Sequence, residues 1–148
     1  MKQVTLYADG ACSRNPGPGG WAAILIYGEK VKKISGFQQD STNNIMELTA
    51  VIEGMKALKE KCEIDIFTDS KYIVDAVSEW LPNWQKNGWK TSAGKPVKNV
   101  ELWREIVELK GFHKIKWNWI KGHDGNFYNE ECDVMAKEQI ESNKKQIR

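Results

Sequence analysis

Apolar positions along the chain follow two periods, one typical of β-strands and one typical of α-helices. Short runs rich in β-branched and aromatic residues predict strands at residues 3–9, 20–27, 31–37, 63–68 and 113–120. Apolar residues at intervals of three and four predict helices at residues 42–58, 70–79, 100–109 and 129–142. The strands therefore come first as a group and then alternate with helices.

This order of elements predicts an α/β fold with a five-stranded mixed sheet flanked by helices. A turn-rich connection joins the first two strands and a short turn joins the next two, so the three should form an antiparallel meander. The first, fourth and fifth strands should run parallel, because helices provide their crossover connections. A chain of 148 residues with 41% apolar content can bury one ordinary core. We expect one domain over residues 1–142 and a frayed polar tail over residues 143–148.

Composition excludes several classes of protein. No apolar run approaches the roughly 20 residues needed to cross a bilayer, and the N-terminus already reads as a strand rather than a secretory signal. Cys12, Cys62 and Cys132 have neither a C-x-x-C spacing nor an even count, which argues against disulfides and against a thiolate zinc site. We expect a soluble cytoplasmic monomer with no membrane association and no disulfide-linked partner.

Four acidic residues stand where a charge is locally out of character. Asp9 and Asp69 each close an apolar strand, Glu47 lies beside the apolar stripe of the first helix, and Asp133 lies in the polar start of the last helix. Taken alone, each Asp is better explained as a turn or helix cap, but Glu47 is not easily explained in that way. Ligands of α/β proteins bind at the carboxyl ends of parallel strands, and an acid near a core requires a cation. Four convergent acids predict a magnesium site.

Residues 79–100, which we call the basic segment, combine three tryptophans with four lysines and one acid. The segment has Pro, Gly and Asn punctuation and no helical or strand period, so it predicts an irregular, protruding surface element. Its lysines can contact phosphates and its rings can pack on sugars or bases. The alternative is a loop pinned by its tryptophans with solvated lysines, and the two interpretations are compatible. The residues concerned are Trp80, Trp84, Trp89, Lys86, Lys90, Lys95 and Lys98.

The motifs of this chain, in order, carry a family resemblance. They are DGACSRNPGPGGWAAIL, STNNIMEL, FTDSKYIVDAV, NWQKNGWKTSAGKPVKNVELW, IKWNWIKGH and NEECDVMA. Over nearly its whole length the chain resembles a bacterial-type type 1 ribonuclease H with a basic protrusion. The resemblance implies the ribonuclease H fold and endonucleolytic hydrolysis of the RNA strand of RNA–DNA hybrids. It also implies two Mg²⁺ ions, with Mn²⁺ as a substitute, and products with 5′-phosphate and 3′-hydroxyl ends.

The same resemblance assigns roles to the residues of the catalytic site. Asp9 is expected to be shared between the two metal ions, Asp133 to serve the ion that activates water, and Glu47 and Asp69 to serve the leaving-group side. His123, in a Gly-flanked loop, is expected to assist proton transfer or product release, although loop histidines are also common without a function. His113 starts an amphipathic strand, and from that position alone it is interpreted as a residue without a catalytic role.

The resemblance also names the substrate contacts. Asn15, Asn43 and Asn44 match positions that read the RNA strand, Thr42 and Asn99 match positions that hold a DNA phosphate, and Tyr72 and Trp80 match aromatic positions that line the DNA groove. Trp84, Lys86, Trp89 and Lys90 of the basic segment are added as binding residues. By themselves, the residues at 15 and 42–44 are explained as turn or capping residues. Two departures, Asp40 and Asp124, stand where relatives place a basic and a small residue.

Three other functions fit parts of the sequence. A DNA-cutting nuclease or integrase of the same fold would share the acids but would not need the three asparagines. A non-catalytic hybrid-binding module would keep the basic segment without an intact acid set. A ribonuclease H domain of a larger polymerase is disfavoured by the start at Met1.

Overall fold

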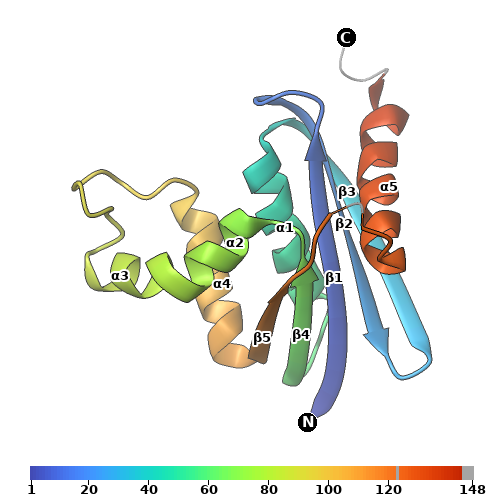
Figure 1. The fold of residues 1–148 in the computed structure, drawn as a ribbon, viewed down its shortest axis with the longest axis horizontal. Helices are drawn as coiled ribbons and strands as arrows, with labels where there is room; N and C mark the ends of the chain where they lie inside the picture. Colours follow the sequence, from blue (N-terminus) through green and yellow to red (C-terminus); the bar gives the residue numbers. More distant parts are fainter. Residues whose placement is uncertain (123, 145–148) are drawn as a thin grey trace.

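The computed structural model describes residues 1–122 and 124–144, and it contains one five-stranded mixed sheet with the order β3-β2-β1-β4-β5 (Figure 1). The strands are β1 (Lys2–Cys12), β2 (Gly17–Tyr27), β3 (Lys30–Ser41), β4 (Cys62–Thr68) and β5 (Lys114–Trp119). The helical elements are α1 (Asn43–Lys56), α2 (Lys71–Asp75), η1 (Ala76–Trp80), α3 (Leu81–Lys86), α4 (Val100–Phe112) and α5 (Phe127–Ser142). β1, β2 and β3 pair antiparallel, while β4 pairs parallel with β1 and β5. The predicted fold class is confirmed.

Helices cover the two faces of this sheet unequally. α5 lies against one face, while α1 and α4 lie on the other, and α3 projects to the side (Figure 1). Alternate residues of β1 explain the arrangement, since Val4, Leu6 and Ala8 are buried and belong to the main core with α1. A smaller core beneath α5 joins Ala22 of β2 with Cys132. The acidic residues lie where these layers meet the end of the parallel strands.

The first helix has the cap and the apolar stripe that its sequence predicts. The Thr42 hydroxyl accepts a hydrogen bond from the Ile45 amide at 3.2 Å, which satisfies one of the free donors of the first turn. Leu48, Val51 and Met55 are fully buried at three- and four-residue spacing. This packing fixes the helix against β1 and places its first turns near the carboxyl end of β4.

One part of the predicted secondary structure is wrong. The basic segment is not irregular throughout, because its residues Leu81–Lys86 form α3, and the predicted helix at 70–79 is divided into α2 and the π-helical η1. Pro82 is compatible with the first turn of a helix, where its missing N–H leaves no bond unmade. Leu81 is fully buried and Trp84, three residues on, packs on the same core. Core packing therefore forms a short helix that periodicity did not indicate.

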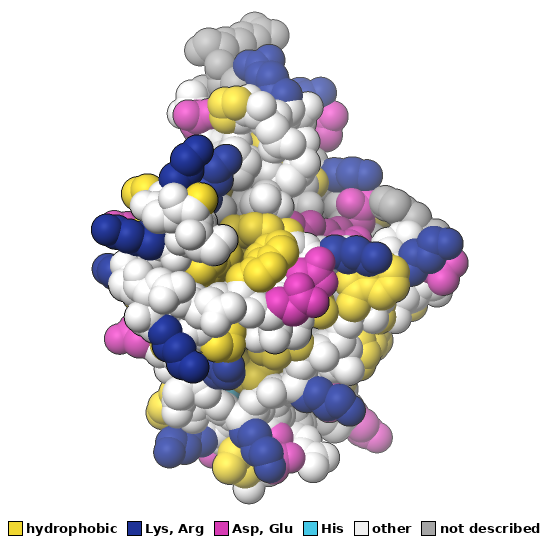
Figure 2. All heavy atoms as spheres, turned by 60° about the vertical axis from the view of Figure 1, so that its left-hand side comes forward, with side chains coloured by type: hydrophobic (Ala, Val, Ile, Leu, Met, Phe, Trp, Pro, Cys, Tyr) yellow, Lys and Arg dark blue, Asp and Glu magenta, His cyan; other side chains and the backbone are white. Residues whose placement is uncertain are grey.

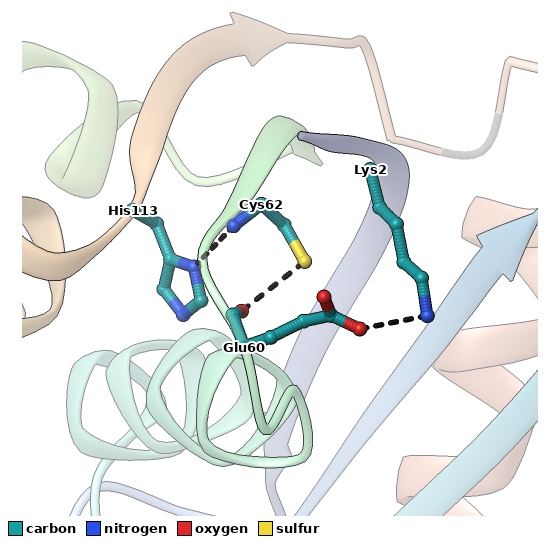
Figure 3. A network of polar contacts seen from close by, with 4 residues as sticks. All are labelled: Lys2, Glu60, Cys62 and His113. Atoms are coloured by element: carbon teal, nitrogen blue, oxygen red, sulfur yellow. Dashed lines mark hydrogen bonds and ion pairs between the residues drawn. The ribbon is translucent and has the colours of Figure 1, made fainter.

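A polar network fixes the end of β4 that lies away from the acids (Figure 3). His113 is buried, and its Nδ1 accepts a hydrogen bond from the Cys62 amide at 3.1 Å. Lys2 Nζ and Glu60 Oε1 form an ion pair at 2.7 Å beside it. The network ties the starts of β1, β4 and β5 together.

No helix in the described part of the chain is long and apolar enough to cross a membrane.

Candidate active site

Three of the four predicted acids meet at one point. Asp9 of β1, Glu47 of α1 and Asp69, which follows β4, each offer a carboxylate oxygen, and these oxygens lie within 4.8 Å of one another. The parallel pairing of β1 and β4 runs as far as Tyr7 and Phe67, so Asp9, still in β1, and Asp69, just after β4, each stand two residues beyond it. The topology therefore brings together residues that are 60 positions apart in the sequence.

Gly10 allows α1 to approach this point. A Cβ atom at residue 10 would lie 2.5 Å from both the Glu47 amide nitrogen and the Met46 carbonyl carbon, which are backbone atoms that cannot yield. The Gly10 amide also donates a hydrogen bond to Asp9 Oδ1 at 2.9 Å. Gly10 was not predicted as a functional residue, since its signal in the sequence is only a glycine directly after an acid at the end of an apolar run.

The electrostatics of this cluster favour a cation. Burial and the neighbouring carboxylates of Asp69 and Asp133 raise the pKa of Asp9 to about 7, although a hydrogen bond with Glu47 opposes the rise. Burial and the charge of Asp9 raise the pKa of Glu47 well above its ordinary value. Within the described structure Glu47 Oε2 is buried and has no hydrogen-bond partner. A dication would neutralise these charges and give that oxygen a ligand, and an all-oxygen donor set suits a hard ion such as magnesium.

Asp133 stands beside the three-acid cluster rather than in it. It is partly buried on α5, and its charge contributes to the raised pKa of Asp9. Its Oδ2 pairs with Lys137 Nζ at 3.0 Å, one helical turn further on. α5 starts at Phe127 rather than at the predicted residue 129, so Asp133 lies in its second turn. The other predicted catalytic residue, His123, lies outside the described residues.

All five residues that were predicted to bind the RNA strand or a DNA phosphate line one polar hollow near the starts of α1 and α4. It is lined by Asn15, Thr42, Asn43, Asn44, Ile45, Lys98 and Asn99. Asn15 Oδ1 accepts a hydrogen bond from the Asn43 amide at 2.8 Å, which fixes the β1–β2 connection to the start of α1. Thr42 therefore caps α1 and Asn15 bonds to the start of that helix, while Asn43 and Asn44 are exposed. Lys98, one of the lysines of the basic segment that can contact phosphates, adds a positive charge to this hollow.

Tyr72 and Asn99 are held together at the edge of this hollow. The Tyr72 hydroxyl accepts hydrogen bonds from Asn99 Nδ2 at 3.3 Å and from Trp103 Nε1 at 3.0 Å. Asn99 has a left-handed backbone with φ 59°, a conformation that asparagine tolerates better than most residues. Trp103 is fully buried, so the bonds anchor both polar side chains to the core of α4.

The tryptophans of the basic segment divide into two groups. Trp80 keeps 40% of its surface exposed and can meet a ligand. Trp84 and Trp89 are partly buried against the main core, and Trp84 meets Trp103 edge to face with 5.7 Å between ring centroids. Lys86 and Lys90 are exposed. Figure 2, which brings the α3 side forward, shows exposed apolar side chains near its centre with Lys and Arg side chains spread around them.

Comparisons with known proteins find relatives that align over nearly the whole chain. The family model described as RNase H matches residues 1–141. The chain is 53% identical over 146 residues to the "Ribonuclease H" of Acetivibrio thermocellus, covering 98% of this chain and 99% of that protein. It is 52% identical over 141 residues to the "Ribonuclease H" of Brucella anthropi, covering 95% of this chain and 92% of that protein.

Solved structures show the same fold. LC9-RNase H1, described as a type 1 RNase H with the type 2 active-site motif, superposes with a TM-score of 0.86 at 29% identity, over 96% of this chain and 74% of that one. LC11-RNase H1 in complex with an RNA/DNA hybrid, at 20% identity, shares the fold with a TM-score of 0.71 over 94% of this chain and 97% of that one. With a family match over nearly its whole length and relatives above 50% identity, the chain belongs to the ribonuclease H family.

Proposed function

We propose that this protein is a magnesium-dependent endonuclease that hydrolyses the RNA strand of RNA–DNA hybrids. The observation that carries the proposal is the meeting of Asp9, Glu47 and Asp69 within 4.8 Å, with a buried, unpartnered oxygen on Glu47. The membership of the family and the hybrid bound by LC11-RNase H1 support the choice of substrate. Leaving 5′-phosphate and 3′-hydroxyl ends requires that water attack phosphorus opposite the ribose 3′-oxygen.

The acid cluster is proposed to hold two magnesium ions. The charges of Asp69 and Asp133 both act on Asp9, so Asp9 would contact both ions, Glu47 and Asp69 would hold one, and Asp133 would hold the other. Two such ions would neutralise charge on the attacking and leaving oxygens of an in-line displacement at phosphorus. The contact of Asp133 with Lys137 uses only Oδ2, so a metal contact would either use Oδ1 or replace the contact with Lys137. Manganese, which accepts the same oxygen donors, is expected to substitute.

The remaining residues would orient the hybrid and move protons. Asn43 and Asn44, exposed at the start of α1, would hydrogen-bond ribose 2′-hydroxyls, a group that DNA lacks. Thr42, Lys98 and Asn99 would hold a phosphate of the DNA strand in the polar hollow. His123 is proposed to donate a proton to the leaving 3′-oxygen. Recognition by shape and backbone makes little use of base sequence.

Cleavage assays on matched duplexes test this function. Hybrid, duplex DNA and duplex RNA of one sequence, labelled on each strand in turn, should be incubated with magnesium. We expect cuts only in the RNA strand of the hybrid, with chelator abolishing them. Cutting of duplex DNA would favour a DNA nuclease of the same fold, and hybrid binding without cleavage would favour a non-catalytic binding module.

A further inference from the structure

The backbone of Trp89 is in a conformation that tryptophan rarely adopts. Its φ is 64°, and the preceding Gly88 has φ 66°, so two successive residues are left-handed where the chain leaves α3. Glycine adopts this conformation without cost, whereas a bulky side chain meets steric strain. A strained residue of this kind persists only where its surroundings hold it.

Three contacts from different parts of the chain hold Trp89. Its amide donates a hydrogen bond to the Trp84 carbonyl at 2.7 Å, and its carbonyl accepts one from the Val97 amide at 3.0 Å. The guanidinium carbon of Arg104, on α4, lies 5.6 Å from the centroid of the indole ring. This distance is within the range of a cation–π contact. Trp89 is thus joined to α3, to the end of the basic segment and to α4.

Trp89 stands at the base of a small hairpin that carries lysines. Lys90 and Pro96 form an isolated antiparallel bridge directly beyond it, and the Thr91 amide donates to the Lys95 carbonyl at 2.7 Å. Lys86 ends α3 just before it. The orientation of the Trp89 ring and backbone therefore sets where Lys90 and Lys95 are displayed.

We propose that Arg104 is a positioning residue for hybrid binding, which acts by stacking on Trp89 and holding the base of this lysine hairpin. An arginine suits the role because its planar, weakly hydrated guanidinium stacks on an aromatic face better than an ammonium does. The inference rests on the proposed function, because it takes the basic segment as the surface that meets the hybrid. It also assigns the Trp89 ring to supporting the hairpin rather than to stacking on bases.

The test is a double-mutant cycle on hybrid affinity. Arg104→Ala, Trp89→Ala and the double variant are compared with wild type by fluorescence anisotropy of a labelled RNA–DNA hybrid, with chelator present. Loss of a partly exposed cation–π contact predicts about two- to fivefold weaker binding for Arg104→Ala. KM should rise by the same factor while kcat is unchanged. The double variant should bind no more weakly than Trp89→Ala, because Arg104 acts only through that ring.

Lys110→Ala provides the matched control, since Lys110 is an exposed basic residue of the same helix. It should bind as wild type does, which would show that loss of one charge from α4 is not the cause. Far-UV circular dichroism should show equal folding for all variants. Additive losses in the double variant would mean that Arg104 contacts the hybrid directly and would overturn the inference. Wild-type affinity of Arg104→Ala for the hybrid would also overturn the inference. In that case, cleavage of the hybrid by the wild type would leave the proposed function standing. A wild type that neither bound nor cut the hybrid would overturn both.

Discussion

Replacing Asp9 by asparagine should stabilise the metal-free protein. Burial and neighbouring acids raise the pKa of Asp9 from 3.8 to about 7, so folding forces a proton onto this carboxyl or confines a poorly solvated charge. The difference is about 3 pH units, which corresponds to about 4 kcal/mol when Asp9 is ionised in the folded state. The introduced amide would still be a buried polar group, and the pKa of Glu47 would still be raised. We therefore expect Asp9→Asn to raise the free energy of unfolding by about half of that value, about 2 kcal/mol.

The sign of the pH dependence follows from the direction of the shift. Between pH 4 and pH 7 the unfolded chain has lost the Asp9 proton and the folded chain retains it. The free energy of unfolding of the wild type should therefore fall as the pH rises through this window and stay low above it. Asp9→Asn removes this contribution, so the stability difference between variant and wild type should be large at pH 8 and small at pH 4.

Urea unfolding followed by circular dichroism, with chelator present, measures this difference. Asp40→Asn, which alters an exposed acid at the end of β3, is the control and should change little. Added magnesium should stabilise the wild type more than Asp9→Asn, because only the intact cluster binds the ion well. An Asp9→Asn protein that was less stable than wild type at pH 8, or one whose difference from wild type did not depend on pH, would refute the reasoning.

Three further substitutions have defined outcomes. Gly10→Ala should lower stability by about 1–3 kcal/mol in urea unfolding and raise the magnesium concentration for half-maximal activity, because its Cβ would push α1 away from β1. His113→Ala leaves the Cys62 amide unpaired and should cost about 1–3 kcal/mol in the same assay, with kcat unchanged. Lys90→Ala should weaken hybrid binding and reduce its salt slope by about 1, without changing kcat at saturating substrate; a collapse of kcat would assign Lys90 to catalysis.

Much of the site was predictable because it depends on where strands end. Asp9 and Asp69 each follow an apolar run, and parallel pairing of β1 with β4 places such positions side by side. Glu47 was identifiable because an acid next to an apolar helical stripe is out of place. The close approach of α1 to Gly10 was not predictable, since it is set by the distance between two layers rather than by any periodicity.

The basic segment was the least predictable region. Its proline, glycine and asparagine residues indicate turns, yet burial of Leu81 and packing of Trp84 produce α3. Sequence also could not separate the exposed Trp80 from Trp84 and Trp89, because the distinction depends on contacts with the distant α4. The position of Asp133 beside the cluster, paired with Lys137, likewise depends on how α5 packs against the sheet.

The rate of hybrid cleavage as a function of magnesium concentration, for wild type and Glu47→Gln, tests the central claim most directly. If the acids hold the catalytic ions, the wild type should be inactive with chelator and recover with magnesium. The cleavage rate of Glu47→Gln should be lower than that of the wild type by roughly 10³-fold or more, because several kcal/mol of charge stabilisation depends on the metal. Cleavage that persists with chelator, or a Glu47→Gln protein as active as the wild type, would contradict the account.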